Sequence, residues 1–447
     1  MVNMKTLIRI VFVIFIANGI DCLGSYNCCI FPKYENIIKD ENITAKSLVN
    51  IVWYSTKKNL VLKIFEKKEN GIFTSEGNED KISIKLDEND NTKIAYQNKT
   101  EDKLNLKNKK YALFEIKTRA NKTVYLYCSD VESSEKDKGI FKDMDHISIS
   151  VIACDTEKVT DMRYMLYGCS NLENLDIINF NTTNVSNMKY MFSECSSLAE
   201  IDLNYFDTTN VSNMKVMFSN CRNLTKLDLE NFNTTNVTDM RYMFSGCSSL
   251  TELIFGENFN TKKVTNMESM FSGCSSLKEL IFVENFNTSN VTDMRFMFSK
   301  CSSLTKLDLK NFDTENVTDM RYMFSECSSL KDLNLNNFNT TNVTNTRSIF
   351  SGCSSLTKLD LKNFNTEKVT NMRSMFSRCS SLTEIDLKKF NNKNVTNMKR
   401  MFSGCSSLKN LDLKNFNISK VKHKKKMFDN CDNLPQDIIN EILGKNE

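Results

Sequence analysis

The chain repeats one phrase in which the hydrophobic pattern changes its period halfway through. In the copy at residues 224–247, LTKLDLENFNTTNVTDMRYMFSGC, the leucines follow the spacing L-x-x-L-x-L. Leu227 and Leu229 flank Asp228, and this alternation places two leucines on one side of an extended chain and the aspartate on the other. The first half of the phrase therefore predicts a short strand.

The second half of the phrase has the spacing of an amphipathic helix. Its apolar residues are Val237, Met240, Met243, Phe244 and Cys247. On a helix they would fall within an arc of about 120°. Thr238 stands where an N-cap is expected and Gly246 suits a left-handed C-cap, so a short helix with one buried stripe is predicted.

The cysteine that ends the phrase marks its period. It recurs after 26 residues, and twice after 27, at Cys169, Cys195, Cys221, Cys247, Cys274, Cys301, Cys327, Cys353, Cys379, Cys405 and Cys431. A strand and a two-turn helix cannot bury their own apolar residues, so each copy must pack on the next. Residues 154–434 are therefore predicted to form an α/β solenoid of leucine-rich-like repeats, with a parallel sheet on one side and short helices on the other.

A polar column follows the phenylalanine of each copy. It is always Asn or Asp, as at Asn233, Asn260 and Asp313. Such side chains bond backbone groups at tight corners, so this column is interpreted as structural.

These phrases resemble those of the BspA-like surface proteins, whose leucine-rich-like units carry sequences close to FNTTNVTDMRYMFSGCSSLTELDL. The resemblance extends from Cys154 to Leu434. It implies a secreted or surface-displayed protein with a role in adhesion or host contact, and it implies no catalytic residues. It carries no information about residues 23–150.

Residues 1–21 have the pattern of a secretory signal peptide. Lys5 and Arg9 precede an apolar run over residues 10–17, and a small-x-small sequence follows at residues 17–19. The alternative is an uncleaved anchor, for which the run is shorter than the ~20 apolar residues of a spanning helix. The expected localisation is secreted or at the cell surface, with membrane contact only through the signal peptide or a non-covalent surface association.

A small β-rich domain is predicted over residues 22–153. Alternating and β-branched runs indicate strands at residues 59–66, 81–87, 111–117, 123–128 and 146–154. This domain is expected to cover the N-terminal edge of the repeat sheet. Residues 435–447 are expected to cap the last repeat with a short helix.

Charge and chemistry narrow the function classes. The 447 residues include 59 basic and 55 acidic side chains, a net charge of +4 that is too balanced to indicate a nucleic-acid partner. Two histidines, no C-x-x-C pair, no phosphate-binding glycine loop and no Ser-His-Asp arrangement predict neither an enzyme nor a metal or cofactor site. Calcium on stacked aspartates such as Asp228, Asp308 and Asp360 stays an alternative to a solvated mixed-charge surface.

The cysteine column permits two interpretations. Stacked repeats would bring neighbouring thiols close to disulfide distance, and the secretory route is oxidising. Each cysteine nevertheless falls on the apolar stripe, where a thiol packs as a small hydrophobe, and this interpretation is preferred. Cys22, Cys28, Cys29 and Cys128 are the better disulfide candidates.

A basic residue followed by an aromatic recurs on the predicted helical side. The pairs proposed as a partner-binding stripe are Arg163 and Tyr164, Lys189 and Tyr190, Arg241 and Tyr242, Arg295 and Phe296, and Arg321 and Tyr322. Arginine and tyrosine are enriched in binding hot spots, which favours an adhesive stripe. The alternative is a solvated basic edge whose aromatics pack between neighbouring repeats.

Together these patterns predict a secreted or surface-displayed repeat protein that mediates adhesion or protein–protein contact through the solenoid, without catalysis. The expected partner is a protein or another cell-surface ligand. A self-associating structural coat or wall protein is the alternative. A hydrolase within residues 22–153 is disfavoured because nucleophile and base pairs are scarce there.

Overall fold

The computed structural model describes the strands between residues 62 and 155 by their backbone. It describes residues 156–443 with their side chains, apart from 157–158, 179, 414–415 and 419–420. The predicted signal peptide over residues 1–21 lies outside the described residues. The chain divides into two compact units, residues 1–211 and residues 212–447.

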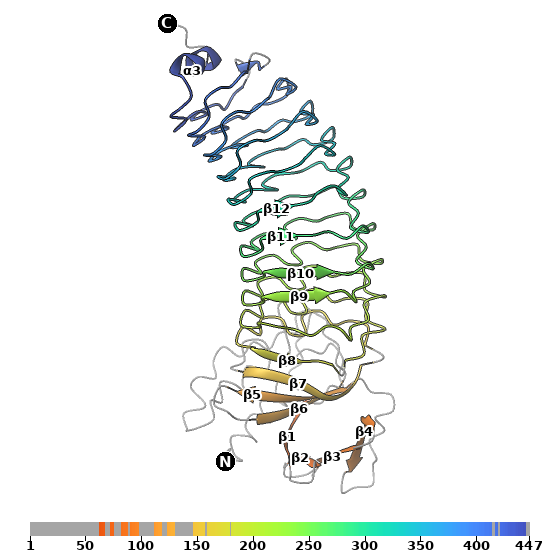
Figure 1. Cartoon of the computed structure of the whole chain (residues 1–447). Coiled ribbons are helices and arrows are strands. Elements are labelled where there is room, and N and C mark those ends of the chain that lie inside the picture. The colour runs from red at the N-terminus through yellow and green to blue at the C-terminus, as the bar shows by residue number, and fades with distance from the viewer. Residues whose placement is uncertain are drawn as a thin grey trace, which may run out of the picture. The chain divides into compact units, whose positions relative to one another are not determined.

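Unit 1 contains an eight-stranded sheet with the order β4-β3-β2-β1-β6-β5-β7-β8 (Figure 1). Its strands are β1 (Leu62–Lys67), β2 (Ile72–Ser75), β3 (Ile82–Asp87), β4 (Asp90–Gln97), β5 (Tyr111–Thr118), β6 (Thr123–Ser129), β7 (His146–Asp155) and β8 (Asn174–Asp176). The described pairings are antiparallel except that of β7 with β8, which is parallel. All five strand segments predicted from the β-branched runs coincide with strands, namely β1, β3, β5, β6 and β7.

The β7–β8 pair joins the N-terminal sheet to the first repeat. Ser148 pairs with Asn174 and Ser150 with Asp176. A parallel sheet presents unpaired backbone groups at its edge, which favour the addition of another strand. Within unit 1, β7 occupies that edge, as the sequence predicted for the N-terminal domain.

Unit 2 consists of tandem repeats, here called coils, with short strands in parallel pairs. The strands are β9 (Lys226–Leu229), β10 (Glu252–Phe255), β11 (Glu279–Leu280) and β12 (Lys306–Leu307), with β10 on β9 and β11 on β12. Leu227 and Leu229 are fully buried, as their alternation predicted. In later coils the matching leucines are also buried, but the structure assigns no strand between residue 308 and the C-terminus of the described part.

The short helices predicted in each coil are wrong. Residues 241–246 form successive turns, and Tyr242 and Gly246 have positive φ values of 59° and 76°. Every coil repeats these two left-handed positions. The second is Glu194, Asn220, Lys300, Glu326, Arg378 or Asn430 where glycine is absent.

Backbone hydrogen bonds explain why the helix does not form. The N–H of Met243 donates to the carbonyl of Met240 (3.2 Å), three residues earlier, whereas the N–H of Phe244 donates to Met270 of the next coil (2.9 Å). This alternation continues along the turns, so every second N–H bonds across coils. An α-helix would direct all of these donors four residues back along its own chain. The neighbouring coil supplies better-placed acceptors, and the apolar residues are buried without a helix.

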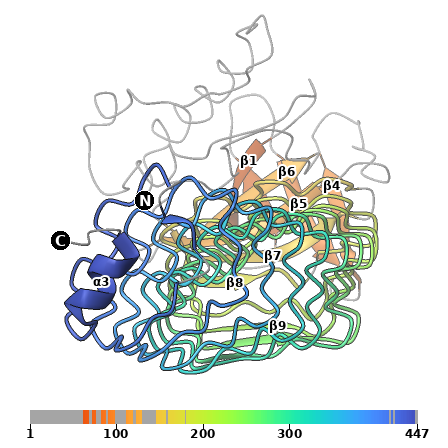
Figure 2. The ribbon, with the colours of Figure 1, turned by 90° about the horizontal axis from the view of Figure 1, so that it is seen from above.

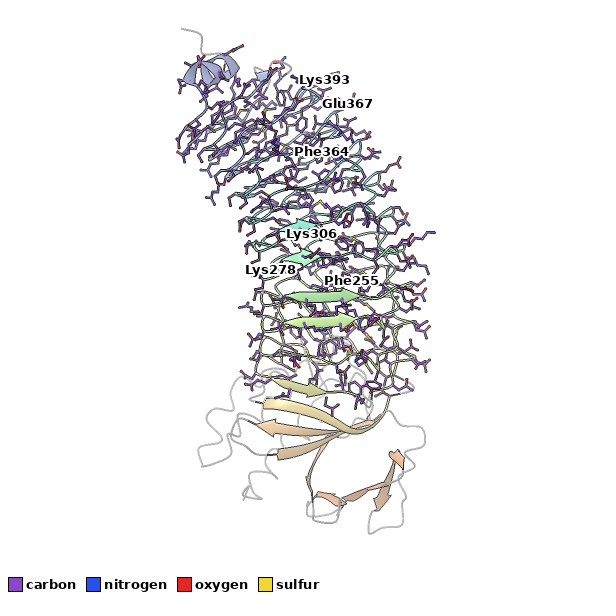
Figure 3. The ribbon with its side chains drawn as sticks, in the orientation of Figure 1. Phe255, Lys278, Lys306, Phe364, Glu367 and Lys393 are labelled. Atoms are coloured by element: carbon purple, nitrogen blue, oxygen red, sulfur yellow. The ribbon has the colours of Figure 1, made fainter. Side chains whose placement is uncertain are left out.

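The core is built from columns of identical side chains. Ring centroids of Phe244 and Phe271 lie 5.5 Å apart, those of Phe271 and Phe298 5.7 Å, and those of Phe298 and Phe324 5.7 Å, in stacked geometry. In Figure 3, Phe364 lies within the stack of coils, whereas the labelled polar residues Glu367 and Lys393 project from its edge. Each coil thus buries its apolar side chains against its two neighbours.

A buried threonine column adds a second ladder. Thr314 Oγ1 donates to the carbonyl of Asn339 in the next coil (2.9 Å) and accepts the N–H of the same residue (2.9 Å). The side chain of Asn339 then accepts the N–H of Thr341 (3.1 Å). The Asn or Asp column after phenylalanine is therefore structural, as its pattern predicted.

The predicted C-terminal helix is α3 (Gln436–Leu443), which ends unit 2 (Figure 2). Asp437 lies in its first turn, where the helix dipole favours a carboxylate. In the part of the chain that the structure describes, no helix has the length and apolar character needed to cross a membrane.

Candidate interaction surface

The turns that replace the predicted helices form one continuous surface in unit 2. We call it the turn wall, and define it as residues 213–221, 239–247, 266–274, 293–301, 319–327, 345–353, 371–379, 397–405 and 423–431. Its first column consists of Asp and Asn, with His423 in the last coil, and is linked from coil to coil by single parallel bridges, such as Asp293 with Asp319 and Asn345 with Asn371. Equal positions of successive coils are therefore direct neighbours.

The arginines of the predicted stripe are held by their own aspartates. Arg241 donates from Nε and its terminal nitrogen to Asp239 at 2.9 and 2.6 Å, and its backbone N–H bonds the same carboxylate at 3.1 Å. Equivalent ion pairs join Arg163 to Asp161, Arg295 to Asp293 and Arg321 to Asp319, each at 2.7 Å. In each pair the arginine follows the aspartate by two residues, and the chain bends between them so that the two side chains meet.

These ion pairs neutralise the arginines of the stripe. The hydrogen bond with Asp239 raises the pKa of Arg241. Burial acts to raise the pKa of Asp239, but the hydrogen bonds and charge of Arg241 outweigh burial and lower it. The pKa of Arg295 is raised chiefly by Asp293, with help from Glu268. An anionic ligand would have to compete with these carboxylates, so the arginines of the stripe offer little free charge.

The aromatic residues of the stripe pack between coils. Tyr164 is only 2% exposed and stacks on Tyr190 at 4.7 Å in unit 1, and Phe296 stacks on Tyr322 at 4.5 Å in unit 2. Burial raises the pKa of Tyr242, and its hydrogen bond with Glu268 adds to this effect.

The stripe is thus less accessible than its sequence pattern suggested. The other nine residues are half-buried: Arg163, Lys189, Tyr190, Arg241, Tyr242, Arg295, Phe296, Arg321 and Tyr322. The first two pairs belong to unit 1 and the others to unit 2. This packing favours the alternative in which the aromatics fill space between neighbouring coils.

In the later coils, three basic residues beyond the stripe have asparagine in place of the aspartate partner, as Lys215 also has at Asn213. Arg347, Arg373 and Lys399 occupy the arginine column in later coils, but asparagine replaces aspartate two residues earlier in each case. Among the described residues, none of the three takes part in an ion pair. The change from D-x-R to N-x-R or N-x-K was visible in the sequence, but its meaning depended on the turn that brings the two side chains together.

The cysteine column is buried and free in the described part of the chain. The Sγ of Cys247 donates to the carbonyl of Phe218 in the preceding coil (3.1 Å), and Cys353 and Cys379 bond Phe324 and Phe350 in the same way. Burial raises the pKa of Cys247 and of Cys353 to about 12. These thiols are therefore protonated packing groups.

The aspartates of the strand side, for which calcium binding is the alternative, accept hydrogen bonds that stabilise turns. Asp308 accepts the N–H of Lys310 (3.0 Å) and Asp360 accepts that of Lys362 (3.0 Å), and each also pairs with the lysine ammonium. Among the described residues, no group of three or more metal-ligating side chains is placed to hold an ion.

Comparison with known proteins agrees with the tandem repeats. The family described as "Mycoplasma protein of unknown function, DUF285" matches residues 136–256, 253–358 and 330–441, and each matched segment covers several coils. No curated protein and no solved structure matches the chain. Because the matches together extend over more than half of its length, the chain belongs to the family of Mycoplasma proteins of unknown function, DUF285.

Proposed function

We propose that the protein is a secreted or surface-displayed solenoid of the leucine-rich, BspA-like type that binds a partner through its stacked coils and has no catalytic role. The observation that carries this proposal is the turn wall. There, backbone ladders hold equal side chains of successive coils side by side. Such a surface suits recognition of an extended partner, because the same contact is repeated at each coil.

The leader-like pattern of residues 1–21 supports export, and the resemblance to BspA-like proteins supports contact at a surface. The partner is a protein or another cell-surface ligand. Two features of the turn wall support binding over reaction chemistry. Arg241, Arg295 and Arg321 are paired with carboxylates, and the cysteines of the wall are protonated and buried.

Antibody labelling of intact source cells tests this proposal. One antibody recognises residues 62–129 and a second recognises the coils. A third, against a cytoplasmic protein of the same cells, controls for membrane integrity. We expect both of the first two to label non-permeabilised cells or to detect the protein in the medium. Labelling by all antibodies only after permeabilisation would contradict export and the contact role.

The alternative, a self-associating coat, has a different signature. Cross-linking of copies through the cysteine column would require exposed thiols, and Cys301 and Cys327 are at most 1% exposed. The binding proposal predicts a monomer in light scattering, with the same mobility on reducing and non-reducing gels. Concentration-dependent polymers that persist in reductant would favour the coat.

A further inference from the structure

The turn wall changes its charge partway along unit 2. The first coil of the wall, 213–221, has Lys215 as its only charged residue, and in the coils at residues 239–247, 266–274, 293–301 and 319–327, Lys and Arg are matched by Asp and Glu. In the next four, 345–353, 371–379, 397–405 and 423–431, which we call the basic wall, the only acidic residue is Asp429. Its basic residues are Arg347, Arg373, Arg378, Lys399, Arg400, Lys424, Lys425 and Lys426.

Asparagine keeps the fold of the basic wall but removes its counter-ions. The Oδ1 atoms of Asn345 and Asn371 accept the backbone N–H of Arg347 (3.1 Å) and of Arg373 (3.0 Å), as Asp319 does for Arg321 (3.0 Å). Only the aspartate also neutralises its arginine, at 2.7 Å. The turn is therefore the same in both halves of the wall, and the difference between them is charge.

The side chain of Arg347 has no carboxylate partner among the described residues. Its Nε is buried and has no hydrogen-bond partner in the described part of the chain, whereas the Nε of Arg321 bonds Asp319 at 2.8 Å. Its guanidinium lies over the ring of Tyr322, 5.3 Å from the centroid, which holds the cation in place. A guanidinium that is held in place and has no carboxylate partner is suited to an incoming oxyanion.

The basic groups are spaced for a linear ligand. Bridges join Asn345 to Asn371, Asn371 to Asn397 and Asn397 to His423, so the coils of the basic wall lie in parallel register. Neighbouring coils in such a register are about 4.8 Å apart. A flexible chain with repeated anionic groups could contact several coils at once, and each contact would release counterions.

The side chains beside the basic column indicate which polyanion fits. Three of the five earlier coils of unit 2 carry an aromatic at the first left-handed position, namely Tyr242, Phe296 and Tyr322, whereas the four coils of the basic wall have Ser348, Ser374, Arg400 and Lys426 there. Binding of single-stranded nucleic acid relies on aromatic rings that stack on bases. Sulfate groups need only cationic donors, so the surface favours a polyanion without bases.

We propose that the basic wall binds a sulfated polysaccharide that runs across consecutive coils. This inference rests on the proposed function, since it gives a partner class to the exported stack. Arg347, Arg373 and Lys399 form the central contacts, and the exposed residues Arg378, Arg400 and Lys425 extend them.

Binding of heparin to the full chain, measured by calorimetry over a range of salt concentrations, tests the proposal. The triple variant R347Q/R373Q/K399Q is expected to bind at least about tenfold more weakly at ~0.1 M salt. Its plot of log affinity against log salt should be shallower by about 2 to 3, because each lost ionic contact removes just under one released counterion. The control K226Q/K306Q/K358Q removes three charges from the strand side and should bind as the unchanged protein does.

A second variant tests the role of the counter-ion without removing any basic residue. N345D/N371D/N397D reproduces the Asp column of the earlier coils, and we expect it to lose most of the affinity. Aspartate can still accept the same turn hydrogen bond, so its circular dichroism spectrum should be unchanged. Equal heparin affinity in both wall variants and the unchanged protein would overturn the proposal.

Two further probes define the ligand class. Chemically desulfated heparin should not bind, and oligo(dT) of matched charge should bind more weakly than heparin. Tighter binding of oligo(dT) would overturn the assignment to a polysaccharide. Surface labelling of cells together with absent heparin binding would contradict only this inference, whereas absent labelling would contradict the proposed function.

Discussion

Single buried thiols couple the stability of the coils to pH. Burial raises the pKa of Cys247, Cys301, Cys353 and Cys405 to about 12, whereas an exposed thiol titrates near 9. Below the unfolded pKa both states are protonated, and the full stability is present. Above it the unfolded chain loses protons that the folded chain keeps, so stability is lost as the pH rises towards 12.

We therefore expect a steep alkaline loss of stability. Between pH 9 and pH 11 each such thiol lowers the free energy of unfolding by about 1.4 kcal/mol per pH unit. Urea unfolding in the presence of reductant at pH 7.5, 9 and 10 measures this slope. Cys353→Ala should reduce the slope of the free energy of unfolding against pH by the contribution of one thiol. It also lowers stability at every pH, because packing contacts are lost. A free energy of unfolding that is flat from pH 7.5 to 10 would disprove the assignment of protonated thiols.

At the scale of one coil, the turns are held by hydrogen bonds to the next coil and not by helical bonds. Thr314 is fully buried, and its hydroxyl satisfies both the N–H and the carbonyl of Asn339. Thr318 is exposed, and its hydroxyl bonds the carbonyl of Thr292, which also accepts the N–H of Thr318 at 2.9 Å. The two threonines therefore differ in what their removal leaves unpaired.

Thr314→Val is expected to lower the free energy of unfolding by roughly 1 to 3 kcal/mol, because it removes the partner of two part-buried backbone groups of Asn339, each worth about 0.5 to 1.5 kcal/mol. Thr318→Val is the matched control, and its cost should stay below about 1 kcal/mol because the backbone bond to Thr292 remains. Urea unfolding of both variants measures the difference. Equal costs would mean that the buried column is not the structural ladder described.

At the scale of the whole molecule, the tandem coils of unit 2 interact mainly with their nearest neighbours. The N–H of Tyr322 donates to Arg347 and that of Phe324 to Ile349, each one coil further along. In such arrays the free energy of unfolding is close to the sum of the intrinsic stabilities of the coils and the interaction energies between neighbouring coils. The length of the stack should therefore be adjustable in whole coils only.

Duplication of residues 317–342 tests this modularity. The added 26 residues keep the register, so we expect a folded protein with the same circular dichroism per residue. Its urea m-value should rise, since more surface is exposed on unfolding. Insertion of only the first 13 residues at the same place breaks the register and should destabilise the stack. Equal tolerance of both insertions would argue against register-dependent stacking.

Much of the architecture could be predicted from local pattern. The 26-residue period, the buried leucine and cysteine columns and the strands β1, β3, β5, β6 and β7 all follow from spacings within one or two elements. The candidate stripe was found by the same means, because its basic and aromatic columns are regular. Its accessibility could not be predicted, since the stacking of Phe296 on Tyr322 depends on the distance between coils.

The sequence by itself determined which leucines and cysteines are buried and how often the coil repeats, because both depend on the order of apolar and polar residues along the chain. Only the tertiary structure decided that the apolar half of each coil is a series of turns. The acceptor for Phe244 is Met270, 26 residues away, and no local pattern encodes that competition with a helix. The same turns decided which cations are neutralised. Asp319 reaches Arg321 only because the chain bends between them, whereas Asn345 makes the same bend and leaves Arg347 without a carboxylate.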